Sequence, residues 1–329
     1  SIYCLDNLFF EMKSIVLYPA LLLVGGVSTW CALSTSESRG PEIFGVQDTK
    51  TSKQPKVRRN IINIDSLRGT LGHWENRLNE IREIPTDLSD QEIRSLFTLI
   101  DQLDQNGNEE HLLMINEIME VLENKYHYNP VFIDSMLEIV SSPLRQDTVR
   151  DYAIQHVVKA VVHDPAREGA ILYTDASENL QLKHQVFESI LTQLNHQANS
   201  QALFVGTGIN MLGESLQEFQ LNDALQHRYD QLLTQVVSGE RVLSNYARVT
   251  TIQIAARTQG EDIAPVLRRL INDNSQALDI HISAVAGLGI TGDTQDLVLL
   301  SEISNSSLRS KYAAKAAIKK IQSKAVVAE

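Results

Sequence analysis

A repeat in the last third of the chain restricts its fold more than any other feature. Residues 246–270 and 278–302 share one pattern: a stretch rich in small residues, a turn with glycine and an acidic residue, and a stretch rich in leucine. Gly260 and Gly292 lie 32 residues apart, and a partial third copy covers residues 308–321. Such periods are typical of proteins that stack one supersecondary unit on the next. One helix pair cannot bury its own apolar face, so we expect these units to stack.

Apolar residues recur every three or four positions from residue 65 onward, which predicts amphipathic helices throughout the body. Ser89 and Pro130 have the residue types that begin helices. Turns and helix ends are expected at the breakers Pro85, Gly107, Pro143 and Pro165. Residues 166–180 lack the periodic pattern, and we interpret them as an extended loop or a short helix with a long connection.

The composition favours helices and disfavours nucleic acid as a partner. Hydrophobic residues make up 43% of the chain and aromatic residues only 6%, a balance that suits helices better than strands. Residues 1–60 carry seven basic and five acidic residues, so the rest of the chain has a formal charge of −14. An acidic body is repelled by nucleic acid phosphates and by anionic lipid headgroups.

An uncharged stretch over residues 14–33 predicts export or membrane attachment. We suspect that Met12 is the true start, because Lys13, the apolar stretch and Ala32-Leu33-Ser34 then form the three parts of a secretory signal. The stretch also has the roughly 20 residues that a membrane-spanning helix needs. A cleaved signal peptide and a retained anchor therefore both stay open, and a buried core helix is a third interpretation. Both export interpretations place the body in the cell envelope, in a periplasmic or other extracytoplasmic space.

The chain divides into three parts on this basis. Residues 1–33 hold an upstream extension and the signal or anchor, residues 34–60 form a linker that we predict to be disordered, and residues 61–325 form the helical body. The two cysteines, Cys4 and Cys31, both precede the body. Catalytic cysteines and thiolate metal sites are therefore excluded from it.

The repeated units resemble HEAT repeats, particularly the short type also seen in phycobilisome-lyase-like proteins. That type has an alanine-rich helix followed by Leu-Gly and a turn led by aspartate, which matches residues 286–289 with Gly292-Asp293 and, for the helix, residues 311–318. Val149–Ala153 resembles the Val-Arg-x-x-Ala start of the family. The resemblance is clearest over residues 243–322. It implies an armadillo-like α-solenoid of antiparallel helix pairs that binds partners along its surface, and it provides no catalytic residues.

Two sets of polar residues were candidates for metal binding. Asp101–Glu110 resembles a calcium loop, but with Gly107 at position 6 the bidentate acid of position 12 is replaced by Leu113, so we favour a polar turn. The nine histidines lack the His-Glu-x-x-His spacing of a zinc protease. We therefore predict no metal and no cofactor.

Three further motifs have structural interpretations that we favour. Tyr126-His127-Tyr128 is expected to pack at a turn between repeats rather than to contact a ligand. Gly206-Thr207-Gly208 lacks the rest of a phosphate-binding loop and is interpreted as close helix packing. Asn305-Ser306-Ser307 is a lone glycosylation sequon.

The sequence thus predicts a non-enzymatic scaffold or adaptor in the cell envelope that binds another protein on the solenoid surface. It does not indicate the binding residues. The alternative is a lyase- or chaperone-like protein that acts on a bound protein or cofactor, and this would require a pocket with converging His, Asp or Tyr residues, built around residues 164–180. A purely structural module of a larger complex is a third hypothesis.

Membrane fractionation of cells that express a tagged chain tests the export hypothesis. A retained anchor places the tag in the membrane fraction, and cleavage produces a new N-terminus near Ser34. Wholly soluble protein that still begins at Met12 would contradict both interpretations.

Overall fold

The computed structural model describes residues 74–162, 176–196, 202–306 and 309–328. These ranges contain fourteen α-helices, two 3-10 helices and no strand, which confirms the all-α prediction. The predicted hydrophobic segment and linker, residues 14–60, lie outside them. Within the described ranges, every helix is too short or too polar to cross a membrane.

The helices follow one another along the chain, most of them with short connections. Those of the first half are α3 (Trp74–Arg82), α4 (Asp90–Asn106), α5 (Glu109–Tyr126), α6 (Pro130–Ser141), α7 (Asp147–Val162) and α8 (Ala176–His196). Those of the second half are α9 (Leu203–Glu214), α10 (Leu216–Phe219), α11 (Asp223–Ser238), α12 (Asn245–Thr258), η2 (Gly260–Ile263), α13 (Ala264–Asn272), α14 (Leu278–Thr291), η3 (Thr294–Asp296), α15 (Leu297–Asn305) and α16 (Lys311–Ala328).

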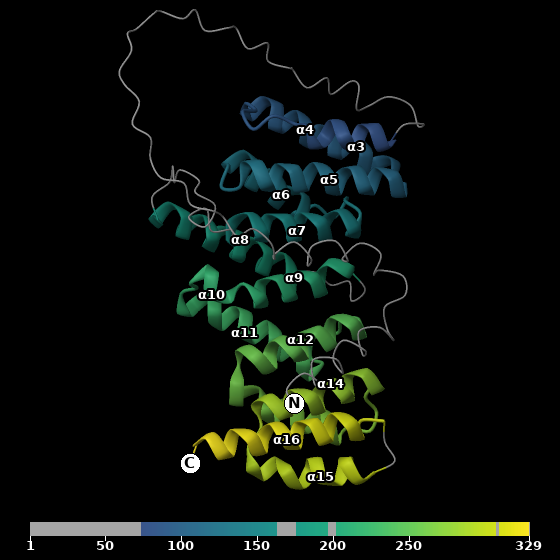
Figure 1. Cartoon of the computed structure of the whole chain (residues 1–329), viewed down its shortest axis with the longest axis vertical. Coiled ribbons are helices and arrows are strands. Elements are labelled where there is room, and N and C mark those ends of the chain that lie inside the picture. The colour runs from purple at the N-terminus through teal and green to yellow at the C-terminus, as the bar shows by residue number, and fades with distance from the viewer. Residues whose placement is uncertain (1–73, 163–175, 197–201, 307–308, 329) are drawn as a thin grey trace, which may run out of the picture. The chain divides into compact units, whose positions relative to one another are not determined.

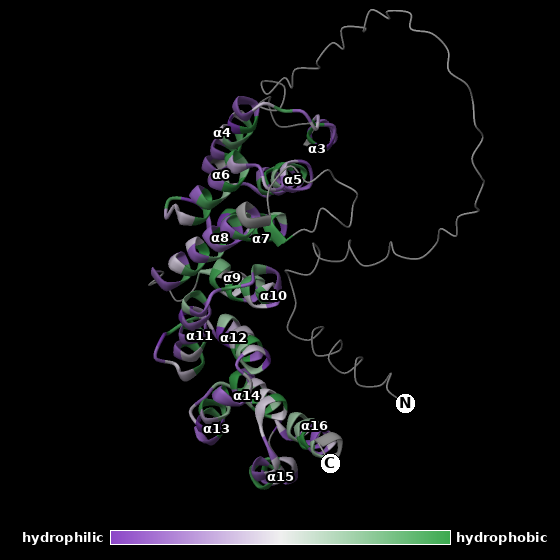
Figure 2. Ribbon diagram, turned by 90° about the vertical axis from the view of Figure 1, so that its left-hand side faces the viewer, coloured by the Kyte–Doolittle hydropathy of each residue, from purple (hydrophilic) through white to green (hydrophobic). Residues whose placement is uncertain are grey.

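The helices of residues 74–328 pack in two layers (Figures 1 and 2). The first layer contains α3, α5, α7, α9, α12, α14 and α16, each of which contacts the next. The second layer contains α4, α6, α8, α11 and α13, again each in contact with the next, and α15 packs on α16 at the end of the series. The chain alternates between the layers, so each helix also packs against its neighbour in sequence.

Helix ends fall where the sequence placed them. Ser89 and Glu92 form a reciprocal capping box at the start of α4, and Gly107 ends that helix with a left-handed conformation (φ 59°) that glycine adopts without strain. Pro130 is the first residue of α6, behind an Asn129 side chain that accepts two backbone N–H bonds.

Helices of the first layer run in the same direction. Gly206, near the start of α9, meets Ala247 near the start of α12, while Gly213 near the end of α9 meets Ile254 in the second half of α12. Gly287, in the second half of α14, likewise packs against the second half of α12. The N-termini of these helices therefore lie along one edge, together with the loops that lead into them. We call this edge the loop edge.

Small residues bring the first-layer helices unusually close together. A Cβ atom added to Gly289 of α14 would lie 2.7 Å from the Cα of Ala317 in α16. Ala255, Ala284 and Ala314 are fully buried in the same layer. Small side chains thus allow the backbones of these helices to approach each other closely.

One type of hydrogen bond recurs between the two layers. The fourth residue of three first-layer helices donates to a carbonyl near the C-terminus of the preceding second-layer helix: Arg150 to Val140 (3.0 Å), Arg248 to Val237 (2.9 Å) and, through its ring nitrogen, His281 to Ile271 (3.1 Å). The last carbonyls of a helix have no partner within it, and these side chains satisfy them. The Val-Arg motif at residues 149–150 therefore has the same structural role as its counterparts near the C-terminus.

The irregular middle of the sequence continues both layers. α8 packs between α6 and α11, and α9 packs between α7 and α12. Residues 166–175 lie outside the described ranges, but α8 already begins at Ala176. Residues 176–180 therefore begin a helix of 21 residues rather than a loop or a short helix, and the pattern did not show this because these residues include few apolar side chains.

Replacing Gly289 by alanine tests the close approach. The added methyl group meets backbone atoms of Ala317 that have no room to move, so we expect a loss of about 1–3 kcal/mol in the free energy of unfolding. Gly206→Ala is the matched control, because its nearest neighbours lie at 3.4 Å and alanine favours a helix by ~1 kcal/mol. Equal urea midpoints for both variants would contradict the packing.

Candidate functional site

Large exposed apolar side chains gather at the loop edge. The described residues include six of them, with exposed fractions of 43–94%: Leu144, Val242, Tyr246, Leu278, Val298 and Tyr312. All but Val298 lie in loops that enter the first layer or in the first turn of its helices. Single exposed apolar residues are ordinary, whereas a group on one edge marks an interaction site.

Three successive first-layer helices contribute to this group. Val242 and Tyr246 stand at the start of α12, Leu278 is the first residue of α14, and Tyr312 is the second residue of α16. These side chains follow one another along the loop edge as a row, at one end of which the ring of Tyr246 lies against Gly206 of α9. Leu144 lies on the same edge before α7.

Ion pairs hold the loop of Leu144 in place. Arg145 pairs with Asp101 and, at 3.3 Å, with the buried carboxylate of Asp104. Gln146 donates to the backbone oxygen (2.8 Å) and side chain (3.0 Å) of Asp104. The loop is therefore fastened to the end of α4, in the preceding pair.

The loops before α12 and α14 are fastened in a similar way. Arg241 donates to Asn195 (3.0 Å) and to the backbone oxygen of Leu194 at the end of α8. Arg248 donates to Gln276 (2.9 Å). Hydrogen bonds from Ser275 and Gln276 lower the pKa of Asp273 to about 2, so this carboxylate stays ionised. The same bonds hold together the loop between α13 and α14. Apolar side chains on fixed loops bind without a large cost for ordering them.

Charged side chains flank the row. Glu240 and Asp279 are exposed beside α12 and α14. At the α16 end the charge changes sign, with exposed Arg309 and with Lys311 5.0 Å from the ring centre of Tyr312. The edge therefore presents an acidic middle and a basic end.

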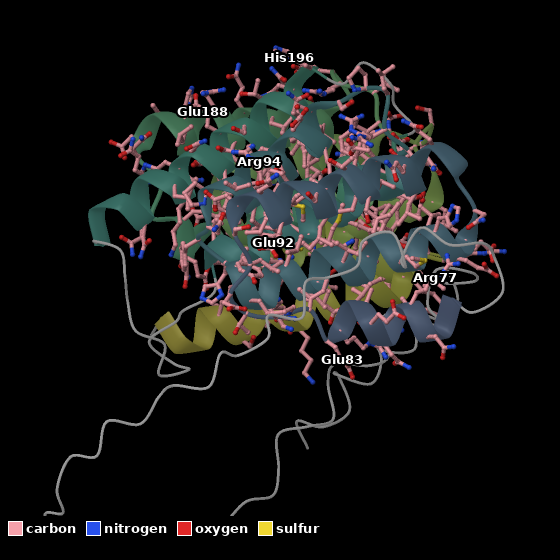
Figure 3. The ribbon with its side chains drawn as sticks, turned by 90° about the horizontal axis from the view of Figure 1, so that it is seen from above. Arg77, Glu83, Glu92, Arg94, Glu188 and His196 are labelled. Atoms are coloured by element: carbon pink, nitrogen blue, oxygen red, sulfur yellow. The ribbon has the colours of Figure 1, made fainter. Side chains whose placement is uncertain are left out.

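Grooves elsewhere in the described structure offer no set of converging catalytic groups. A groove of about 650 Å³ lies between α6 and α8, and one of about 440 Å³ between α13 and α15. Neither is lined by His or Tyr, and no group of three potential metal ligands occurs among the described residues. The second layer instead displays charged side chains such as Glu92, Arg94 and Glu188 on α4 and α8 (Figure 3).

Polar side chains buried in the first layer pair with one another. The ring of His156 lies between the carboxylate of Glu123 (Nδ1–Oε2, 2.5 Å) and the side chain of Asn116 (Nε2–Oδ1, 3.1 Å). Gln155 donates to Asp151 at 2.7 Å, yet burial raises the pKa of the Asp151 carboxyl. These groups connect α5, α7 and α9 rather than facing a cavity.

The segment Asp101–Glu110, the candidate calcium loop, connects the end of α4 to the loop before α7. The Asp104 carboxylate is occupied by Arg145 and Gln146, and Gly107 ends α4. Gly107 and Asn108 thus form the turn between α4 and α5, and the absence of a metal there stays a prediction. No single point in the described structure collects the carboxylates of Asp101–Glu110 for a metal.

The other motifs pack as predicted. The Tyr126 hydroxyl donates to the Pro85 oxygen (2.7 Å), and the Tyr128 hydroxyl donates to the Val161 oxygen (3.1 Å). A Cβ atom on Gly208 would lie 2.9 Å from the side chain of Leu194, which confirms close helix packing. Of the sequon, Asn305 is exposed at the end of α15, and Ser307 lies outside the described residues.

The sequence did not indicate the loop edge, although a weak signal was present. Leu144 and Val242 each stand six residues before the arginine that bonds to the preceding helix, Arg150 and Arg248. An apolar residue that recurs at a fixed position inside a loop does not belong to the buried apolar face of a helix. Aligning the repeats on these arginines would have singled out both positions.

No protein-family model matches the chain, and no curated protein matches it. The resemblance to HEAT repeats therefore stays a prediction.

The buried carboxyl of Asp151 makes stability depend on pH. The pKa of Asp151 is raised in the folded state, so folding favours the neutral carboxyl. The stability that the protonated carboxyl contributes is therefore lost as the pH rises through the folded-state pKa. Asp151→Asn should therefore increase the free energy of unfolding at pH 7, with a smaller gain near pH 4. Exposed Asp134→Asn controls for the loss of a charge. Urea unfolding in which Asp151→Asn is equally destabilising at both pH values would contradict the unfavourable burial.

Proposed function

We propose that the chain is a non-enzymatic scaffold that binds a partner protein along the loop edge, on an α-solenoid of HEAT-like helix pairs formed by residues 61–325. The observation that carries this proposal is the row of exposed apolar side chains on loops fastened by Arg145, Arg241 and Arg248. The two layers of alternating helices and the repeated bond to the preceding helix support the solenoid. We place the scaffold in the cell envelope because of residues 14–33.

The energetics favour a partner that spans several repeats. Full burial of one large apolar side chain stabilises a complex by about 1.5–3 kcal/mol. Association costs about 4–15 kcal/mol in lost freedom. A single edge side chain cannot offset that cost, but most of the five together can. The partner must therefore reach along the edge rather than dock at one loop.

Nothing in the described structure favours the alternative lyase- or chaperone-like activity. That activity would require several His, Asp or Tyr side chains converging on a pocket, whereas the two grooves described above are each lined by one aspartate, Asp134 or Asp296, and by no His or Tyr. The pocket was expected around residues 164–180, of which 164–175 lie outside the described ranges.

Affinity capture from the envelope with the full chain tests the proposal. The double variant Val242→Ser, Leu278→Ser removes two edge side chains, which is worth at least ~2 kcal/mol, so recovery of the specific partner should fall roughly 30-fold. Val298→Ser is the matched control, because Val298 is equally exposed but lies away from the edge. Equal recovery by both variants, with unchanged circular dichroism spectra, would contradict binding at the edge.

A further inference from the structure

We infer that α16 lies against an anionic membrane surface, which it contacts through an exposed group of lysines. We call this group the lysine face, and its residues are Lys315, Lys319 and Lys320, all exposed on α16. The lysine face adds a second contact surface to the proposed scaffold, and the inference rests on the proposed function for the location at a membrane.

The charge of α16 is opposite to that of the rest of the chain. The chain carries 41 acidic and 29 basic residues, but residues 309–324 contain six basic residues and no acidic one. An anionic surface therefore attracts α16 and repels the remainder of the body, which is acidic overall. Charge thus selects which part of the helical body faces a membrane.

The lysine face is open and unpaired. α16 ends the first layer, where it packs against α14 and α15, and its lysine face is covered by neither. Within the described residues, its three lysines take part in no ion pair and no hydrogen bond. The acids of the adjoining η3 segment, Asp293 and Asp296, are instead paired with Arg268 at 3.9 and 2.6 Å. A counter-charge for the lysine face must therefore come from another molecule.

The spacing of the lysines reduces the stability of α16 itself. Lys311, Lys315 and Lys319 follow one another at intervals of four residues, so their side chains are neighbours on the helix surface. Like charges at this spacing destabilise a helix, and cations near its N-terminus oppose the helix dipole. A local arrangement that lowers stability without a structural gain is typical of a functional surface.

The chemistry of the lysine face favours lipid headgroups over an acidic protein segment. All three residues are lysines, whose compact charges suit a diffuse anionic surface, whereas arginine is the residue that pairs best with individual carboxylates. Peptide segments mostly bind in grooves. Neither of the two grooves described above is lined by a residue of α16.

The hydrophobic stretch at residues 14–33 also favours lipid. The proposed function places the chain at a membrane because of this stretch. A second contact with the same membrane then forms at a high local concentration of headgroups. Each lysine close to an anionic surface strengthens binding by roughly fivefold, so the three together contribute about 100-fold.

Chemical labelling of lysine amines in the presence of vesicles tests the inference. The full chain is mixed with vesicles of phosphatidylglycerol and phosphatidylcholine, or of phosphatidylcholine alone, and an amine-reactive reagent is read out by mass spectrometry. Labelling of the lysine face should fall at least roughly fivefold with the anionic vesicles and recover at about 1 M salt. Lys159, which is also exposed in the first layer, on α7, should be labelled equally throughout.

Matched variants decide whether the charges on α16 are responsible. The double variant Lys319→Gln, Lys320→Gln should weaken the contact by roughly 25-fold, so that Lys315 loses its protection. This variant should fold normally, because it removes repulsion between like charges, and a circular dichroism spectrum checks this. Lys159→Gln should leave the protection of Lys315 unchanged.

Equal labelling of the lysine face with both kinds of vesicle would overturn the inference. Protection by a peptide of glutamates, without protection by anionic vesicles, would also overturn it and would assign the face to an acidic protein segment. Both results leave the proposed function standing if capture of the partner still depends on Val242 and Leu278. Loss of that dependence, with protection by anionic vesicles retained, would remove binding at the loop edge and keep the lysine face.

Discussion

The close approach of neighbouring first-layer helices is the constraint on which the rest of the structure depends. Gly289 against Ala317 leaves no room for a larger side chain, and Gly206 lies in van der Waals contact with Ala247. The helices therefore run in one direction at short and even intervals, and their N-termini fall along a single edge. The apolar row exists because this packing aligns loops that are far apart in the sequence.

Fixed loops make that alignment a candidate binding surface. Arg150, Arg248 and His281 bond α7, α12 and α14 to the end of the second-layer helix before each of them, and Arg145 fastens its loop to Asp101 and Asp104. These hydrogen bonds satisfy helix ends that would otherwise lack partners. They also place Leu144, Val242 and Leu278 in solvent without freedom to fold back onto the core. The same groups thus stabilise the stack and present the candidate site.

Local signals were sufficient for the helices and insufficient for the site. The 3–4 spacing of apolar residues, the capping box at Ser89 and the turn at Gly107 act within a few residues, so the sequence alone predicted them. Exposure depends on packing between distant segments. Tyr229 is fully buried with its hydroxyl bonded to Ile209, while Tyr246 is 63% exposed, although both lie in helices of similar composition. The start of α8 was missed because its first turns carry few apolar residues.

The most direct test of the central claim, that a partner lies along the loop edge, is photo-crosslinking in intact cells. A photoreactive phenylalanine analogue at position 278 or 312 should join the chain to one specific protein. The same analogue at position 298, which is also exposed but away from the edge, should not. A crosslink from position 298 alone, or none from the edge positions, would contradict the account.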